Sequence, residues 1–140
     1  MKISARNVFE GQIESVVSGP VNAEVTLALA GGDRIVAVVT QGSVRSLGLA
    51  VGTRAYAIVK APWVIVAAGD GGPRFSARNQ LAGTVASVKA GPINAEVEIR
   101  LPGGAAVQAI VTKEAADELG LAPGVAARAM IQASHVVLAV

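Results

Sequence analysis

The chain contains one short stretch twice: Gly19-Pro20-Val21-Asn22-Ala23-Glu24-Val25 and, after an offset of 91 − 19 = 72 residues, Gly91-Pro92-Ile93-Asn94-Ala95-Glu96-Val97. In the first copy, apolar side chains continue to alternate with other residues up to the pair Gly31-Gly32. Alternation with a period of two is typical of a half-buried β-strand. Two consecutive glycines supply the positive φ angles that a tight hairpin turn requires. The stretch therefore predicts a β-hairpin in each copy.

The repeat extends over most of the chain. Ser4-Ala5-Arg6-Asn7 begins the first copy and Ser76-Ala77-Arg78-Asn79 begins the second, and the same offset then holds without a gap to the C-terminus. Nearly half of the aligned positions are identical, so each copy is one structural unit. We expect one domain over residues 1–68 and another over 76–140. Residues 69–75 form the linker, which begins with the glycine-rich run Gly69-Asp70-Gly71-Gly72-Pro73, typical of a flexible connection.

Each unit is predicted to contain five strands and one short helix. In the first unit the strands are expected over residues 11–17, 23–29, 34–39, 53–59 and 63–67. The helix is expected between the third and fourth strands, over 40–48 and 112–120. Thr112 is a good N-cap and Gly120 is placed to end the helix in the left-handed region. These elements predict a mainly all-β fold of tandem OB-like five-stranded β-barrels, each with one short helix.

Composition and charge restrict the class of protein. Hydrophobic residues make up 52% of the chain and charged residues 16%, which indicates packed domains and excludes disorder. Domains this small cannot bury so much apolar surface alone, so we expect a homo-oligomer. The net charge of +2 is too weak to indicate a nucleic-acid partner. The sequence has no apolar segment of signal-peptide or membrane-spanning length, so a cytoplasmic protein without a membrane partner is expected.

The residues that most enzymes require are missing. The chain has no cysteine, and His135 is its one histidine. A cysteine nucleophile and a Ser-His-acid set are therefore absent, and a transition-metal cation site lacks ligands. No loop carries the Lys of a phosphate-binding Walker motif. We expect a protein that is not an enzyme and that binds no metal as a bare cation.

Hydrogen-bond donors recur at equivalent places in the two units. Ser4 and Arg6 begin the first unit, and Thr40 precedes its helix, as Thr112 does in the second. A fully deprotonated tetrahedral oxyanion accepts hydrogen bonds and donates none, so hydroxyl, amide and guanidinium groups suit it. A Thr before a helix is, however, usually just a cap, and an Arg near a chain end is usually solvated. The residues alone indicate an oligomeric tandem barrel and leave anion binding open.

Several motifs in the same order resemble the molbindins, the Mop/TOBE-type molybdate-binding domains. They are Ser-Ala-Arg-Asn at the start of each unit, Asn-Ala-Glu-Val after the first strand, Val-Thr before the helix, and Lys60-Ala61-Pro62-Trp63. The resemblance covers almost the whole chain, twice. It is to the free-standing two-domain member of the family, since no helix-turn-helix or ATPase motif is present. It implies a cytoplasmic binding protein for molybdate or tungstate storage and homeostasis, with the oxyanion as ligand and no cofactor.

The resemblance also implies where the oxyanion binds. The assembly would be a trimer of two-domain chains, with oxyanions held by hydrogen bonds at domain and subunit interfaces. One kind of site would use Ser4, Arg6, Thr40, Lys60, Ala61 and Pro62, with Ser76, Arg78, Thr112, Gln132, Ala133 and Ser134 in the second unit. A second kind, near the threefold axis, would use Val21, Asn22 and Ala23, with Ile93, Asn94 and Ala95.

Two residues depart from the family pattern at these sites. Gln132 replaces the family's Lys in the second unit, and Pro62 replaces its Ser in the first. The interface sites are therefore expected to be unequal.

Two other functions stay open: a regulatory or docking module that senses molybdate for a transporter or regulator, and a nucleic-acid-binding OB-like protein. The second lacks stacking platforms, since the aromatic residues are only Phe9, Tyr56, Trp63 and Phe75.

Overall fold

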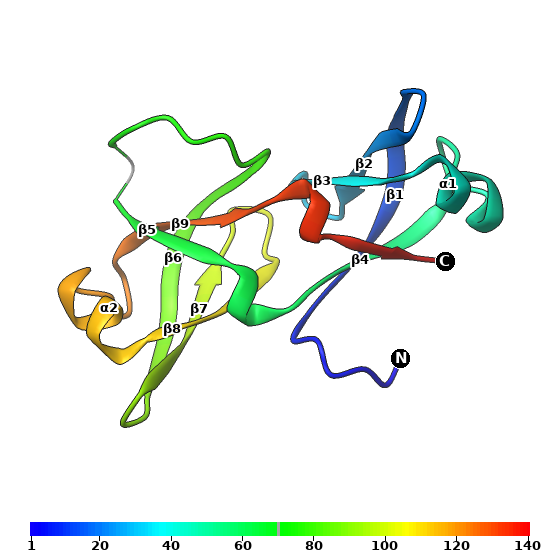
Figure 1. The fold of residues 1–140 in the computed structure, drawn as a ribbon. Coiled ribbons are helices and arrows are strands. Elements are labelled where there is room, and N and C mark those ends of the chain that lie inside the picture. Colours follow the sequence, from blue (N-terminus) through cyan, green and yellow to red (C-terminus); the bar gives the residue numbers. More distant parts are fainter. Residues whose placement is uncertain (70) are drawn as a thin grey trace.

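The computed structural model describes residues 1–69 and 71–140, so Asp70 of the predicted linker lies outside the described residues. The chain forms two five-stranded antiparallel sheets of similar construction (Figure 1). The elements of the first repeat are β1 (Asn7–Ser18), β2 (Asn22–Leu29), β3 (Arg34–Thr40), α1 (Gln41–Leu47), β4 (Arg54–Val59), the 3-10 turn η1 (Ala61–Trp63) and β5 (Ile65–Ala68). Those of the second are β6 (Asn79–Ala90), β7 (Asn94–Arg100), β8 (Ala106–Thr112), α2 (Lys113–Glu118), β9 (Ala126–Ile131), η2 (Ala133–His135) and β10 (Val137–Ala139).

The predicted hairpin is confirmed as β2 and β3. Ala23, Val25, Leu27 and Leu29 are buried along β2 while the residues between them are partly exposed, as the alternating pattern predicts. The turn places Gly31 and Gly32 at φ angles of 92° and 97°. β1 begins four residues before the predicted strand at 11–17 and pairs with both β2 and β4. Its register shifts between Ile13 and Ser15, which allows the long strand to bend.

The two short helices form where the sequence predicts them. The Thr40 side chain accepts a hydrogen bond of 3.0 Å from the Ser43 backbone N–H, and Gly48 ends α1 in the left-handed region with φ 63°. Thr112 caps α2 in the same way, accepting a bond of 3.1 Å from the Ala115 backbone N–H. Both threonines are therefore structural caps as well as candidate ligand donors.

The last strand of each repeat joins the sheet of the other repeat. The strand orders are β10-β4-β1-β2-β3 and β5-β9-β6-β7-β8, so β10 pairs with β4 and β5 pairs with β9 (Figure 1). The edge strands β10 and β3 also come into contact, as do β5 and β8, which curls each sheet toward a barrel. The simple expectation that one repeat supplies all five strands of its barrel is corrected here. The strand expected over 63–67 also starts later, at Ile65, because Ala61, Pro62 and Trp63 form the turn η1.

Two buried asparagines tie the halves together. The Asn79 side chain accepts a 2.7 Å bond from the Val36 backbone N–H and donates to the Val36 carbonyl at 2.8 Å. Asn7, at the equivalent position, bonds the backbone of Gln108 at 2.7 and 2.8 Å. Asn7 and Asn79 are 1% and 2% exposed, so each amide replaces water for strand groups of the opposite half.

Large apolar residues remain on the surface around this core. Val17, Val21 and Ile93 are 63%, 70% and 76% exposed, and all three lie near the β1–β2 or β6–β7 turns. Within the part of the chain that the structure describes, no helix has the length and apolar character needed to cross a membrane.

Candidate functional site

A cavity of about 420 Å³ lies where the exchanged strand β10 passes β3 and α1. Its polar lining consists of the side chains of Asn22, Thr40, Ser43 and Ser134; Val38, Val39, Leu47, Val136, Val137 and Leu138 form the apolar part. We call this the α1 cavity. Thr40 and Ser134 belong to different repeats, and the strand exchange brings them together. Three of the polar residues, Asn22, Thr40 and Ser134, were predicted as site residues.

The hydroxyl groups of the α1 cavity are held by the helix cap. Thr40 Oγ1 accepts the Ser43 backbone N–H at 3.0 Å and donates to Ser43 Oγ at 3.0 Å. Because the Thr40 hydroxyl uses its proton in the bond to Ser43, the proton of the Ser43 hydroxyl remains available to a ligand. The side chains of Asn22 and Ser134 make no hydrogen bond to another described residue and are exposed. The cavity therefore presents neutral donors, without a charged side chain in its lining.

The same position in the other half is lined differently. Applying the offset of 72 residues gives Asn94, Thr112, Ala115 and Pro62, which we call the α2 position. The turn η1, which carries Pro62, contacts β8 in the way that η2 contacts β3. On the outer side of α2, a groove of about 540 Å³ is lined by Pro92, Ile93, Thr112, Lys113, Glu114, Asp117 and Glu118. This groove is predominantly acidic, and its Lys113 is paired with Asp117 at 2.9 Å.

The backbone at the start of each helix is already engaged. The Gln41 N–H donates to the Val21 carbonyl at 2.9 Å, and the Lys113 N–H donates to the Ile93 carbonyl at 2.8 Å. A backbone hydrogen bond thus links each segment of the predicted second kind of site, at Val21 or Ile93, to the first residue of the helix beside the first kind of site. This arrangement leaves the side chains of Asn22 and Asn94 at the surface.

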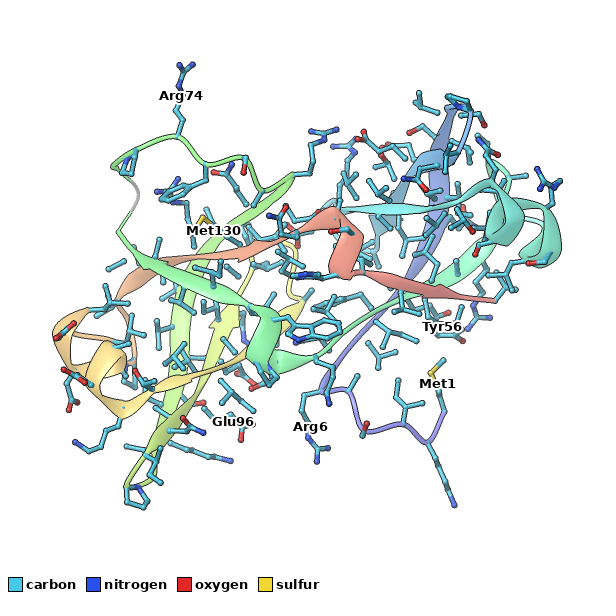
Figure 2. All side chains as sticks on the ribbon, viewed as in Figure 1. Met1, Arg6, Tyr56, Arg74, Glu96 and Met130 are labelled. Carbon is cyan, nitrogen blue, oxygen red and sulfur yellow. The ribbon has the colours of Figure 1, made fainter. Side chains whose placement is uncertain are left out.

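The two predicted arginines have different surroundings. Arg78 binds the Glu24 carboxylate through two nitrogens, at 2.7 and 3.2 Å, and this hydrogen bonding lowers the pKa of Glu24 and raises the pKa of Arg78. Arg6 lies on the N-terminal segment at the outer surface (Figure 2). It lines a groove of about 420 Å³ that also contains Glu10 and the Gly103–Gly104 turn, and it forms no ion pair with a described residue.

The other predicted site residues divide by exposure. Ala23, Ala61, Ala95 and Ala133 are buried, so they offer a ligand only backbone groups. The remaining members of the predicted set are exposed and line none of the cavities described above: Ser4, Lys60, Ser76 and Gln132. Ser43 was missed by the sequence analysis. Its signal is the spacing Thr40-x-x-Ser43, which places a second hydroxyl one helical turn from the cap.

The structure offers little for a metal cation. Among residues 1–69 and 71–140, no three side chains of His, Cys, Asp or Glu gather closely enough to hold a metal ion. The site chemistry is that of hydroxyl and amide donors, which suits an oxyanion.

Paired curled sheets with Thr-capped helices and a hydroxyl-lined cavity define a tandem β-domain binding protein. The TOBE domain family matches residues 3–66 and 76–138, and the chain belongs to this family. It is 45% identical over 139 residues to "Molybdenum-pterin-binding protein MopA" of Rhodobacter capsulatus, covering 99% of this chain and 52% of that protein. It is 42% identical over 140 residues to "Molybdenum transport protein ModE" of Azotobacter vinelandii, covering 100% and 52%.

A solved structure matches over the whole length. This chain is 54% identical, with a TM-score of 0.95, to the cytoplasmic molybdate-binding protein ModG in a crystal form with molybdate bound; the match covers 100% of this chain and 99% of that one. By contrast, the chain spans about half the length of the curated relatives that it matches. The TM-score and the coverage show that the match with ModG extends to both repeats and to their relative arrangement.

Proposed function

We propose that this protein binds molybdate or tungstate reversibly and serves as a cytoplasmic store of the oxyanion. The observation that carries the proposal is the α1 cavity, in which Thr40 and Ser134 from different repeats converge with Asn22 and Ser43. The molybdate bound to the similar protein ModG supports the choice of ligand. The oxyanion is cargo, and no cofactor is part of the proposal.

The donor chemistry fits a dianion of tetrahedral shape. Hydroxyl and amide groups donate to oxygen atoms without forming bonds to the central metal, so the anion can enter and leave intact. Hydrogen bonds to a charged partner are stronger than neutral ones, about 1.5–3 kcal/mol each. Sulfate has shorter bonds than molybdate, so donors spaced for molybdate hold it less well. We infer a binding protein that is not an enzyme.

We further propose that the oxyanion sites are completed by neighbouring subunits in a homotrimer. Ser4, Arg6, Lys60 and Ser76 are exposed and stand apart from the α1 cavity within one chain, so a second chain is needed to bring such donors to it. The exposed apolar side chains of Val21 and Ile93 lie beside the predicted axial residues Asn22 and Asn94. An apolar surface of this kind is typical of a subunit contact.

Titration calorimetry with molybdate, tungstate and sulfate tests the function. We expect saturable heats with molybdate and tungstate, at more than one anion per chain, and none with sulfate. Sedimentation analysis of the same sample should give a trimer. Absence of heat with molybdate from an intact oligomer would disprove the storage function.

A second candidate function is a sensing module. The relatives named ModE are a transport protein and, in Yersinia pestis, a transcriptional regulator that is 34% identical over 140 residues. A module of this kind would dock on a partner protein in a way that depends on molybdate, whereas the storage protein would not. We propose that this chain itself makes no nucleic-acid contact, since its net charge is only +2. Gel-shift and pull-down assays with and without molybdate separate these functions.

A further inference from the structure

We propose that the α1 cavity binds the oxyanion more tightly than the α2 position, and that Ser43 and Ser134 are the residues that set this difference. The inference rests on the proposed oxyanion function and specifies which of its two repeat-related sites is filled first. Its basis is the set of side chains that the strand exchange places at each site.

The first argument is the number of donors. The α1 cavity has three hydroxyl groups, on Thr40, Ser43 and Ser134, together with the Asn22 amide. At the α2 position, Ala115 replaces Ser43 and Pro62 replaces Ser134, so Thr112 supplies the one hydroxyl beside the Asn94 amide. Proline also lacks a backbone N–H, so Pro62 cannot compensate through the main chain. An oxyanion therefore meets fewer side-chain donors at the α2 position: Thr112 and Asn94, against Ser43, Ser134 and Asn22 in the α1 cavity.

The second argument is the charge on the adjacent helix. α1 contains no acidic residue and carries Arg45, whereas α2 carries Glu114, Asp117 and Glu118. These carboxylates line the groove at Thr112 and repel a dianion there. Lys60 opposes this effect on the α2 side, where the α1 side has Gln132. With Lys113, which is paired with Asp117, this makes two exposed positive charges against three negative ones, and salt screens exposed charges strongly.

The difference in chemistry leads to a difference in salt dependence. The donors that one chain supplies to the α1 cavity are neutral, so the affinity of this site should change less with ionic strength than that of the α2 position. Binding at the α2 position depends on Lys60 and on the nearby carboxylates, so its affinity should change with ionic strength. Calorimetry at two sodium chloride concentrations should therefore resolve a tight class of sites that is less sensitive to salt and a weaker class that is more sensitive.

The test uses molybdate as the probe and variants that interchange the two sites. Ser43→Ala gives the first repeat the residue of the second, and Ala115→Ser does the reverse. We expect Ser43→Ala and Ser134→Ala each to weaken the tight class by about tenfold or more, since each removes a hydrogen bond to a charged ligand. Ala115→Ser should strengthen the weak class. Lys60→Gln should weaken it and leave the repulsion by the carboxylates, so that the remaining affinity rises with ionic strength. Ser46→Ala, on the same helix as Ser43 but outside the cavity lining, is the matched control and should leave both classes unchanged.

The outcomes separate this inference from the proposed function. Molybdate binding by the unmodified protein, with Ser43→Ala and Ser134→Ala without effect on the tight class, would overturn the inference and leave the function intact. An equal loss of affinity in both classes would also overturn the inference and leave the function intact. Absence of molybdate binding by the unmodified trimer would overturn both. Circular dichroism confirms that each variant is folded before titration.

Discussion

The rings of Trp63 and His135 lie against each other, with centroids 5.1 Å apart and planes inclined by 42°. The two residues occupy the same position of the repeat, since 63 + 72 = 135. Each ends the 3-10 turn at which its strand crosses to the other sheet. The contact therefore joins the two crossing points. In each repeat the ring directly follows a predicted site segment: Trp63 follows Lys60–Pro62, and His135 follows Gln132–Ser134.

Replacing His135 with Ala should expose Trp63 further and weaken the crossing. Aromatic pairs contribute about 0.5–1.5 kcal/mol beyond the area that they bury, so the free energy of unfolding should fall by about this amount. Because Trp63 is the one tryptophan in the sequence, its emission maximum should shift to longer wavelength in the folded protein. Urea unfolding followed by fluorescence measures both effects. An unchanged spectrum would mean that the rings are not in contact in solution.

Asn79→Leu should be among the more destabilising single substitutions. The change leaves both the N–H and the carbonyl of Val36 without their side-chain partner in a part-buried setting. Each unsatisfied buried group costs about 1–3 kcal/mol, so we expect a loss of at least about 2 kcal/mol. Thermal unfolding measures it, with Gln12→Leu on the exposed face of β1 as the control. Equal melting temperatures for the two variants would contradict the role of Asn79.

Gly31 and Gly32 offer a matched pair of substitutions. Both have positive φ, at 92° and 97°, so alanine is strained at either position. A Cβ on Gly31 would come within 2.2 Å of the Gly103 carbonyl oxygen, whereas a Cβ on Gly32 would meet nothing within 4 Å. Gly31→Ala should therefore lower the melting temperature clearly more than Gly32→Ala. Similar values for the two would show that the hairpins of the two repeats do not touch in solution.

The ion pair between Glu24 and Arg78 should make stability depend on pH. Hydrogen bonding to Arg78 lowers the pKa of Glu24 below its ordinary value of 4.5 in the folded protein. A lowered folded pKa means that the pair stabilises the fold above pH 4.5 and that this contribution is lost as the pH falls through the folded pKa. Because both side chains are partly exposed, the effect should be small and should weaken with salt.

Urea unfolding at pH 7 and at pH 3.5 tests the pair. Glu24→Gln should lower stability at the higher pH and have little effect at the lower one. The pair Glu14–Arg34, which lies within the first repeat, provides a comparison, since hydrogen bonding to Arg34 lowers the pKa of Glu14 in the same direction. A pH dependence that Glu24→Gln leaves unaltered would rule out Glu24 as its source.

The sequence by itself determined the local structure. The alternation through Ala23, Val25 and Leu27, the glycine turn and the capping threonines specify hairpins and helices, because each depends on neighbouring residues only. The recurring donors included Thr40, whereas Asn22 and Ser134 were predicted through the resemblance to the molbindins. These predictions needed no knowledge of how the two repeats meet.

Only the tertiary structure decided which strand completes which sheet. β5 and β10 come from the same part of the repeat, so an alternating apolar pattern suits either of them to either sheet. The chain crosses to the other sheet at η1 and η2, so β5 pairs in the second sheet and β10 in the first. The side chains of Asn7 and Asn79 form hydrogen bonds between the same two halves. The meeting of Thr40 with Ser134 follows from that choice. Ser43 could be identified as a lining residue only from the structure, because the cavity is formed by residues that are distant in sequence.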